Sequence, residues 1–450
     1  MTKDLTRGNP LKLILLFTIP ALIGNVFQQL YSMVDSVIVG RFVSLEGLAA
    51  VGASGPVTFM VIMSVIGLTN GFAVITAQRF GAGDAKGVRS SVVTSLILCG
   101  IMTVIITGIG LFTVTPLLKV MNTPEEIFHD AWLYSVIIYC GFIATIYYNM
   151  MSSIIRALGD SKTPLYFLIF SSVLNVIVDL ILILVFHMGV AGAAYATVFA
   201  QLISAIVCTI YAFKNYEIIK LTKEDMVFDW SLAWEHLKIG FPMAMQGVIT
   251  GVGIIVFQAV LNGFGAAAIA AYTAASKVEI LITQAVASLG LTMSTYCGQN
   301  YGAGRMDRIR QGIRCSVWMG VVASLLIGAL MIFGGRASTM LFLSEPTEEV
   351  LEYAATYLRT IGFFQIPLTI LFIFRNSLQG LGDGMTPLMG GIGELVARIL
   401  IVLTLPATMG YLGICFASPM AWIFADIPLV GKYIWMMRKY KKKERWEAKA

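Results

Sequence analysis

Hydrophobic residues along this chain gather into long runs that short polar and charged segments separate. Each run holds about twenty residues, the length that an α-helix needs to cross the hydrocarbon core of a bilayer. The first run is too long for the apolar region of a signal peptide, so we expect it to remain as a span. The pattern predicts twelve spans, at residues 13–37, 51–77, 91–115, 132–155, 165–186, 190–213, 239–262, 268–294, 313–335, 353–374, 388–408 and 411–436.

Composition excludes a soluble protein. Hydrophobic residues make up 58% of the 450 residues, and charged residues only 12%. So few charges cannot cover the surface of a soluble chain of this length. The fold class that follows is an all-α integral membrane protein, and the bilayer is its first partner.

The distribution of lysine and arginine predicts the orientation. With the N-terminus inside, most of the 31 basic residues fall in the tails and loops of the inner side, as the positive-inside rule requires. Both termini are therefore expected in the cytoplasm. The net charge of +6 reflects this topology, so we expect contact with anionic lipid and no binding of nucleic acid.

The cysteines and histidines give no sign of catalysis or metal binding. All six cysteines lie in or at the ends of predicted spans, without a pairing pattern or a CxxC motif. The three histidines lie near span ends, and no spacing typical of a nucleophile and its base is present. We expect no enzyme activity, no disulfide, no metal site and no cofactor.

The chain contains an internal repeat. A motif at Ile19 returns at Phe241, and three longer segments also return: Gln78–Asp84 as Gln299–Arg305, Arg156–Leu165 as Gln379–Leu388, and Met188–Thr197 as Met409–Ser418. The longer segments are separated by 221, 223 and 221 residues. So constant an offset indicates duplication of one half of the protein.

Each half contains six predicted spans, an even number, so both halves start on the same side of the membrane. Repeats of this kind are parallel and are related by an axis along the membrane normal. We expect two pseudo-symmetric six-helix halves around a central cavity. The predicted organisation is a first half at 1–213, a cytoplasmic connector at 214–238, a second half at 239–436 and a basic cytoplasmic tail at 437–450.

The repeated "LGD" turns have a structural interpretation. Gly159-Asp160 and Gly382-Asp383 are expected to end one helix, and Thr163-Pro164 and Thr386-Pro387 to begin the next. A role in gating is the alternative.

Two polar stripes interrupt the apolar runs of the first half. Asn25, Gln28, Ser32 and Asp35 are spaced three or four residues apart in the first span, and Ser171, Asn175 and Asp179 are spaced four apart in the fifth. Each spacing places its residues on one helical face. Because a carboxylate at mid-membrane costs about 2.5–3.5 kcal/mol, the stripes favour a hydrated pocket. The alternative is that each aspartate simply faces water at the interface.

Pro20 lies in the same span as Asp35. It removes one backbone hydrogen bond and clashes with the preceding turn, so the helix can bend there. A bendable helix that carries a titratable acid is a candidate switch, although many membrane prolines are tolerated kinks.

The second half carries different polar groups. The seventh and tenth spans have no carboxylate, and they offer Gln246, Thr250, Gln365 and Thr369 instead. Glu394 and Arg398 are four apart and are expected to pair along their helix, whereas Lys277 and Glu279 are two apart and do not face each other. The role of Asp426 stays open between a pocket acid and a water-facing one.

These residues resemble the multidrug and toxic compound extrusion (MATE) family of antiporters over nearly the whole chain. The resemblance rests on "IPALIGNVFQQLYSMVDSVIVG", the "GAGD" and "GAGR" loops and the paired "LGD…TP" turns. It implies a cation-coupling site at Asp35, Asn175, Asp179 and Thr197. It also implies polar groups lining the cavity at Gln28 and Asn149. Ser32 of the first stripe and Gln246 of the seventh span are further substrate-binding candidates.

The lack of carboxylates in the seventh and tenth spans makes the chain similar to the DinF-like branch, where proton coupling through the first half is proposed; sodium at Asp35 and Asp179 stays open. We expect a monomeric multidrug efflux antiporter of the bacterial cytoplasmic membrane that exchanges cationic amphipathic drugs for protons or sodium. A lipid-linked precursor flippase and a passive channel are the alternatives.

Overall fold

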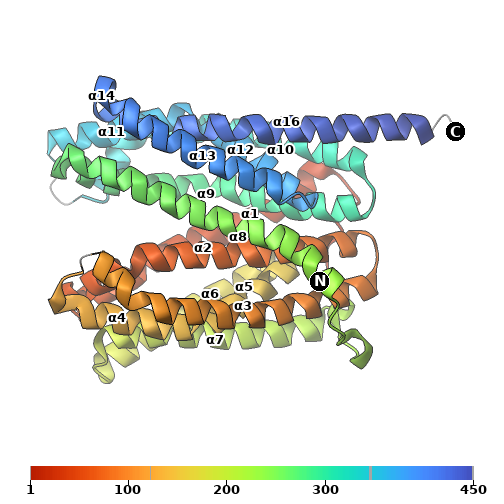
Figure 1. Cartoon of the computed structure of the whole chain (residues 1–450), viewed down its shortest axis with the longest axis horizontal. Coiled ribbons are helices and arrows are strands. Elements are labelled where there is room, and N and C mark those ends of the chain that lie inside the picture. Colours follow the sequence, from red (N-terminus) through yellow and green to blue (C-terminus); the bar gives the residue numbers. More distant parts are fainter. Residues whose placement is uncertain (1, 122, 344–346, 448–450) are drawn as a thin grey trace. The chain divides into compact units, whose positions relative to one another are not determined.

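The computed structural model describes residues 2–121, 123–343 and 347–447, and the chain folds into long helices (Figure 1). Residues 448–450 of the predicted basic tail lie outside the described residues. The helices are α1 (Pro10–Phe42), α2 (Leu45–Gly81), α3 (Ala85–Val120), α4 (Glu125–Cys140), α5 (Phe142–Ala157), α6 (Lys162–Leu180), η1 (Ile181–Val185), α7 (Gly189–Asn215), η2 (Glu217–Ile219), η3 (Lys223–Asp225), α8 (Trp230–Leu261), η4 (Asn262–Phe264), α9 (Ala266–Gly302), α10 (Met306–Met340), α11 (Glu348–Phe363), α12 (Gln365–Gly380), α13 (Met385–Thr404), α14 (Pro406–Met409), α15 (Tyr411–Cys415) and α16 (Ala417–Glu447).

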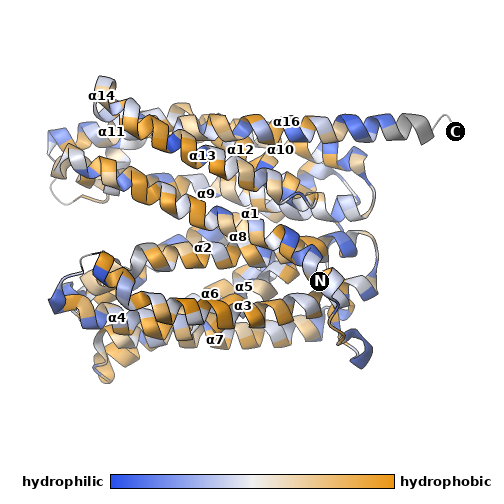
Figure 2. Ribbon diagram, in the orientation of Figure 1, coloured by the Kyte–Doolittle hydropathy of each residue, from blue (hydrophilic) through white to orange (hydrophobic). Residues whose placement is uncertain are grey.

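The described residues contain ten helices that are long and apolar enough to cross a membrane, and two bent helix pairs bring the number to twelve if each pair is one span. The expected all-α membrane fold is confirmed. Figure 2 shows hydrophobic residues along the length of the helices and hydrophilic residues at the C-terminal end of α16. The chain is a multi-pass membrane protein.

Two predicted spans need correction, because each consists of two helices. The run at 132–155 breaks between α4 and α5 with a bend of 46°, and the run at 353–374 breaks between α11 and α12 with a bend of 53°. Pro367, in the first turn of α12, cannot donate to the carbonyl of Phe363 and accounts for the second break, whereas the first break has no proline beside it. At the first break, a Cβ on Gly141 would lie 2.2 Å from a Val198 side-chain carbon, so close packing against α7 requires a glycine there.

The chain divides into two compact units, each described here by itself. Unit 1 comprises residues 2–4 and 19–248, and unit 2 comprises residues 5–18 and 249–447. The division falls within α1 and within α8, so each of these helices belongs to both units. Both helices contain a proline near the division, Pro20 and Pro242.

Backbone conformation supports the internal repeat. Gly83 and Gly304 have φ of 73° and 70°, Gly159 and Gly382 have 87° and 88°, and Gly189 and Gly410 have 57° and 58°. Positive φ values are open to glycine at little cost. The matched motifs therefore adopt matched turns, and the two broken spans are also equivalent positions of the repeat.

The "LGD" turns have the predicted structural role. Asp160 accepts hydrogen bonds from the backbone N–H of Lys162 and Thr163, at 2.9 and 3.1 Å, at the start of α6. Asp383 accepts one from the N–H of Thr386 at 2.9 Å, at the start of α13. Each aspartate thus satisfies helix N–H groups that have no partner within the helix.

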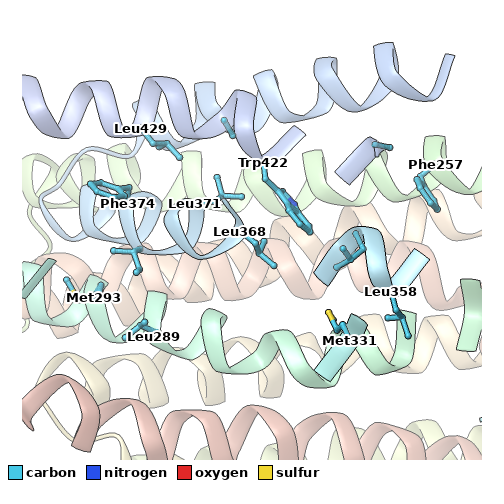
Figure 3. Packing of buried hydrophobic residues seen from close by; sticks show 14 of the residues in the cluster. Phe257, Leu289, Met293, Met331, Leu358, Leu368, Leu371, Phe374, Trp422 and Leu429 are labelled. Carbon is cyan, nitrogen blue, oxygen red and sulfur yellow. The ribbon is translucent and has the colours of Figure 1, made fainter. Parts of the chain in front are cut away.

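Each unit has its own apolar core. In unit 1, Phe72, Met150 and Met151 are fully buried. In unit 2, Figure 3 shows Trp422 and Leu429 of α16 near Leu368, Leu371 and Phe374 of α12. These cores hold the helices that carry the polar groups described next.

Candidate functional site

The candidate site of unit 1 is formed by α1, α4, α6 and α7. Asp35 lies on α1, Asn175 and Asp179 lie on α6, and Thr197 lies on α7, which packs closely against α6. Asp179 precedes the π-helical turn η1 by two residues. Such turns are frequent at functional sites, because they change the direction of side chains within a helix.

The structure brings the four predicted coupling residues together. The carboxyl groups of Asp35 and Asp179 lie close enough to interact electrostatically. The Asn175 side-chain amide donates to the Thr197 hydroxyl at 3.3 Å. Asp179 is fully buried and Asn175 is 1% exposed, so the interpretation in which Asp179 faces water at the interface is wrong.

Two tyrosines complete the cluster and were missed from the sequence. Tyr31 lies close to Thr197 and to both carboxyl groups. Tyr134 of α4 also lies close to both. Tyr31 precedes Asp35 by four residues, so helical spacing gave a signal for it; Tyr134 comes from a separate helix and gave none.

The acid pair lacks donors and cations. Among the described residues, no donor reaches Oδ1 of Asp35 or either carboxylate oxygen of Asp179. In the part of the chain that the structure describes, no lysine or arginine interacts electrostatically with either carboxyl group. Burying two carboxylates together without compensation is costly. A proton shared by the pair, or a bound cation, would remove this cost.

The predicted substrate-binding residues lie on three helices of unit 1. Gln28 and Ser32 are exposed on α1, Asn149 is half-buried on α5, and Gln246 is half-buried on α8. The Asn149 amide donates to the backbone carbonyl of Thr145 at 2.8 Å, within its own helix. Their role in binding stays a prediction.

Pro20 is buried within α1, and the helix continues through it from Pro10 to Phe42. Bending at Pro20 stays a prediction.

Unit 2 contains a second buried polar cluster with a different composition. Glu394 accepts hydrogen bonds from Arg375 at 2.7 Å and from Arg398 at 3.0 Å, which confirms the predicted pairing along α13. All three side chains are at most 15% exposed. The Arg375–Glu394 contact joins α12 to α13 and was not predicted.

Two further acids flank this ion-pair cluster. The Tyr357 hydroxyl donates to Glu279 at 2.7 Å, and Glu279 interacts electrostatically with Arg398. Asp426 of α16 interacts with Arg375 and Glu394, and its Oδ1 is buried. Asp426 is therefore an interior acid. Lys277 is exposed and lies over the ring of Phe342, 5.9 Å from the ring centroid. The prediction that Lys277 does not face Glu279 is therefore confirmed.

The cysteines and possible metal ligands add no further site. All six cysteines are free. Within the described ranges, no three or more histidine, cysteine, aspartate or glutamate side chains form a group able to hold a metal ion.

Comparison with known proteins identifies the family of this chain. The family model MatE matches residues 20–181 and 242–404, which together make up more than half of the chain and follow the two repeats. The chain is 29% identical over 428 residues to the probable multidrug resistance protein YpnP of Bacillus subtilis, covering 94% of both proteins. It is 28% identical to the probable multidrug resistance protein NorM of Thermotoga maritima, covering 82% of this chain and 80% of that protein.

A solved structure agrees over the whole chain. The outward-facing conformation of a multidrug resistance MATE family transporter is 25% identical, with a TM-score of 0.90, and the match covers 97% of this chain and 98% of that one. The resemblance seen in the sequence is thereby confirmed. The chain belongs to the MatE family of membrane transporters.

Proposed function

We propose that the chain is a secondary active multidrug exporter that exchanges cationic amphipathic compounds for protons at the Asp35–Asp179 pair. The observation that carries this proposal is the pair itself: two neighbouring carboxyl groups that interact electrostatically, one of them fully buried, with no lysine or arginine interacting with either among the described residues. A monovalent cation or a proton is the simplest partner for such a pair. The drug exporters among the relatives support the substrate class.

The proposed cycle uses the pair as a charge switch. Facing outward, the pair takes up a proton and releases a cationic drug; facing inward, it loses the proton and rebinds drug. Asn175 donates to Thr197, and Tyr31 lies beside Thr197 and both carboxyl groups, so these three side chains supply the polar surroundings of the pair. Alternating access between the two sides supplies the direction of transport, and the monomer with both termini in the cytoplasm is the unit that transports.

Two acids in one site allow two protons for each drug. One proton exchanged for one monovalent cation moves no net charge, and one pH unit then supports only about a tenfold drug gradient. A second proton adds the membrane potential, worth roughly 2.3 kcal/mol per charge at about 100 mV. Two protons would thus support a drug gradient of roughly several thousandfold. Sodium is the alternative coupling ion at the same pair.

A lipid-linked precursor flippase is the second candidate function. It would need exposed basic groups for a pyrophosphate, and Arg375 and Arg398 are the strongest candidates. Both arginines donate to Glu394 instead, and Lys277 lies against Phe342. These pairings and the transporters among the relatives argue against the flippase.

The test is ethidium efflux from proteoliposomes under an imposed proton gradient, with and without sodium. Wild type should export ethidium, and Asp35→Asn and Asp179→Asn should each lose gradient-driven export. Asp426→Asn is the matched control, because it removes an interior acid of unit 2 and should keep the dependence on the gradient.

The other outcomes separate the alternatives. Export that needs sodium would keep the antiporter and change its ion. Passive flux in the wild type that ignores both gradients would indicate a channel. If wild type shows no coupled export, the antiporter is wrong, and translocation of a labelled lipid-linked pyrophosphate becomes the next assay.

A further inference from the structure

A cavity of about 700 Å³ lies in unit 2 and is lined by other residues than the ion-pair cluster of that unit. It is lined by the first turns of α10, the last turns of α16 and Phe374 of α12, a helix that packs against both. Its volume falls within the range of about 300–1,000 Å³ that is typical of small-molecule sites.

The rim of this cavity is basic. Arg310 and Arg314 are four residues apart on α10, and Arg438 and Lys441 are three apart on α16, so each pair shares a helical face. The acid on the rim, Asp307, is bound by Arg305 at 2.8 Å. In the part of the chain that the structure describes, no carboxylate forms an ion pair with Arg314, Arg438 or Lys441. The rim therefore carries excess positive charge.

The floor of the cavity is apolar and fixed. The Tyr433 ring packs edge-on against Phe374, with centroids 5.2 Å apart, and Phe374 belongs to the core shown in Figure 3. Tyr433 also lies close to Arg310 and Arg314. The aromatic floor therefore lies next to the arginines, so the boundary between the apolar and the charged part of a ligand would lie there.

The apolar side of the cavity continues along a surface of α10. Trp318 follows Arg314 by one turn and is 72% exposed, and Val322 and Leu325 follow at helical spacing with 55% and 60% exposed. Large exposed apolar side chains on a membrane-spanning helix face lipid chains. The same face of α10 therefore presents charge at its start and an acyl-binding stripe after it.

We propose that this cavity, named here the α10–α16 cavity, binds one anionic phospholipid from the leaflet at the basic end of the helices. Its phosphate lies among Arg310, Arg314, Arg438 and Lys441, and one acyl chain lies along Trp318, Val322 and Leu325. A lipid fits better than a soluble anion because the apolar stripe continues directly from the basic rim. Under the proposed orientation, this leaflet is the cytoplasmic one.

The test is native mass spectrometry of the full-length protein titrated with phosphatidylglycerol or phosphatidylcholine. Arg438→Gln/Lys441→Gln removes two rim charges and should weaken phosphatidylglycerol binding by about tenfold or more, since each basic residue near an anionic lipid contributes about one kcal/mol. Lys439→Gln/Lys442→Gln is the matched control, with the same charge loss on the same helix outside the cavity. It should keep the wild-type affinity within about twofold.

Three results would overturn the proposal. Equal weakening by both double variants would indicate diffuse attraction by the basic helix end. Equal binding of both lipids by wild type would remove the role of the rim. If millimolar inorganic phosphate displaces the lipid, and still does so in Trp318→Ala, the cavity is a free-anion site. Loss of lipid affinity in Trp318→Ala supports the acyl stripe.

Discussion

The two units bury acids in opposite ways. In unit 1, Asp35 and Asp179 face each other, and tyrosines are the nearest other titratable groups. In unit 2, Glu394 binds two arginines. Among the described residues, no positive charge interacts with the acid pair of unit 1, whereas two arginines bind Glu394 in unit 2. A duplicated fold can thus hold a labile acid pair in one half and an ion-pair scaffold in the other.

The same contrast recurs at the repeated turns. The Asp160 carboxylate accepts a hydrogen bond from the Tyr216 hydroxyl at 2.8 Å, whereas the Asp383 carboxylate lies 3.4 Å from the Lys432 ammonium group. Threonine N–H and hydroxyl groups donate to both aspartates, and Asp383 has the Lys432 ammonium group in addition. We therefore expect substitutions in unit 2 to affect stability and substitutions in the acid pair of unit 1 to affect coupling.

The largest expected effect on stability comes from Glu394→Gln. This change leaves Arg375 and Arg398 buried without their carboxylate, and breaking a buried ion pair in this way costs about 3–5 kcal/mol. Unfolding in mixed detergent micelles should show this loss. Asp179→Asn, which removes an acid from a pair without a cation, should leave the free energy of unfolding unchanged or higher.

If Asp179→Asn destabilises the protein as much as Glu394→Gln, the contrast between the units is wrong. A bound cation would then hold the acid pair together in the resting protein. Repeating the unfolding measurement with and without sodium would identify that cation.

The sequence predicted some parts of this contrast better than others. Asp35, Asn175 and Asp179 stand out because polar residues at helical spacing are rare in apolar runs, and Glu394–Arg398 stands out because four residues make one turn. Periodicity within one helix does not say which face meets a neighbour. Tyr134 and the contact between Arg375 and Glu394 were therefore invisible.

The broken spans differ in how far the sequence could predict them. Pro367 stands three residues after the break at Phe364 and gave a signal there, whereas the hydropathy run continues through Gly141 without a proline. The break at Gly141 coincides with the approach of Val198 from α7, which is a tertiary contact. The paired turns were predictable because glycine, aspartate and proline act locally.

The next effect comes from Tyr357→Phe in unit 2. This change removes the 2.7 Å hydrogen bond to Glu279 and leaves that carboxylate oxygen without its donor. A hydrogen bond to a charged group contributes about 1.5–3 kcal/mol, and the unfolding midpoint should fall accordingly.

Tyr31→Phe is the matched change in unit 1. The Tyr31 hydroxyl lies beside Thr197, which is a neutral partner, so the loss of stability should be smaller, about 0.5–1.5 kcal/mol. Ethidium efflux by Tyr31→Phe should change more than its stability. A larger stability loss for Tyr31→Phe than for Tyr357→Phe would contradict the contrast.

The smallest effect concerns the Asp160 turn and depends on pH. Burial tends to raise the pKa of Asp160, but the Thr163 N–H and the hydroxyls of Tyr216 and Thr163 donate to it, and together with the Lys162 N–H they hold the pKa below its ordinary value of 3.8. Because the pKa is lower in the folded protein, the carboxylate stabilises the fold above about pH 4. This stabilisation is lost as the pH falls through the folded pKa.

Asp160→Asn should therefore cost less than about 1 kcal/mol at neutral pH, because asparagine caps helices about as well as aspartate and only the contribution of the charge is lost. The difference from wild type should shrink below pH 4, as measured by unfolding in detergent across this range. Asp383→Asn is the matched control at the repeated turn: it also removes the interaction with Lys432, whose contribution high salt should screen. A deficit in Asp160→Asn that depends on salt and not on pH would show that charge pairing, rather than neutral donors, stabilises the turn of unit 1.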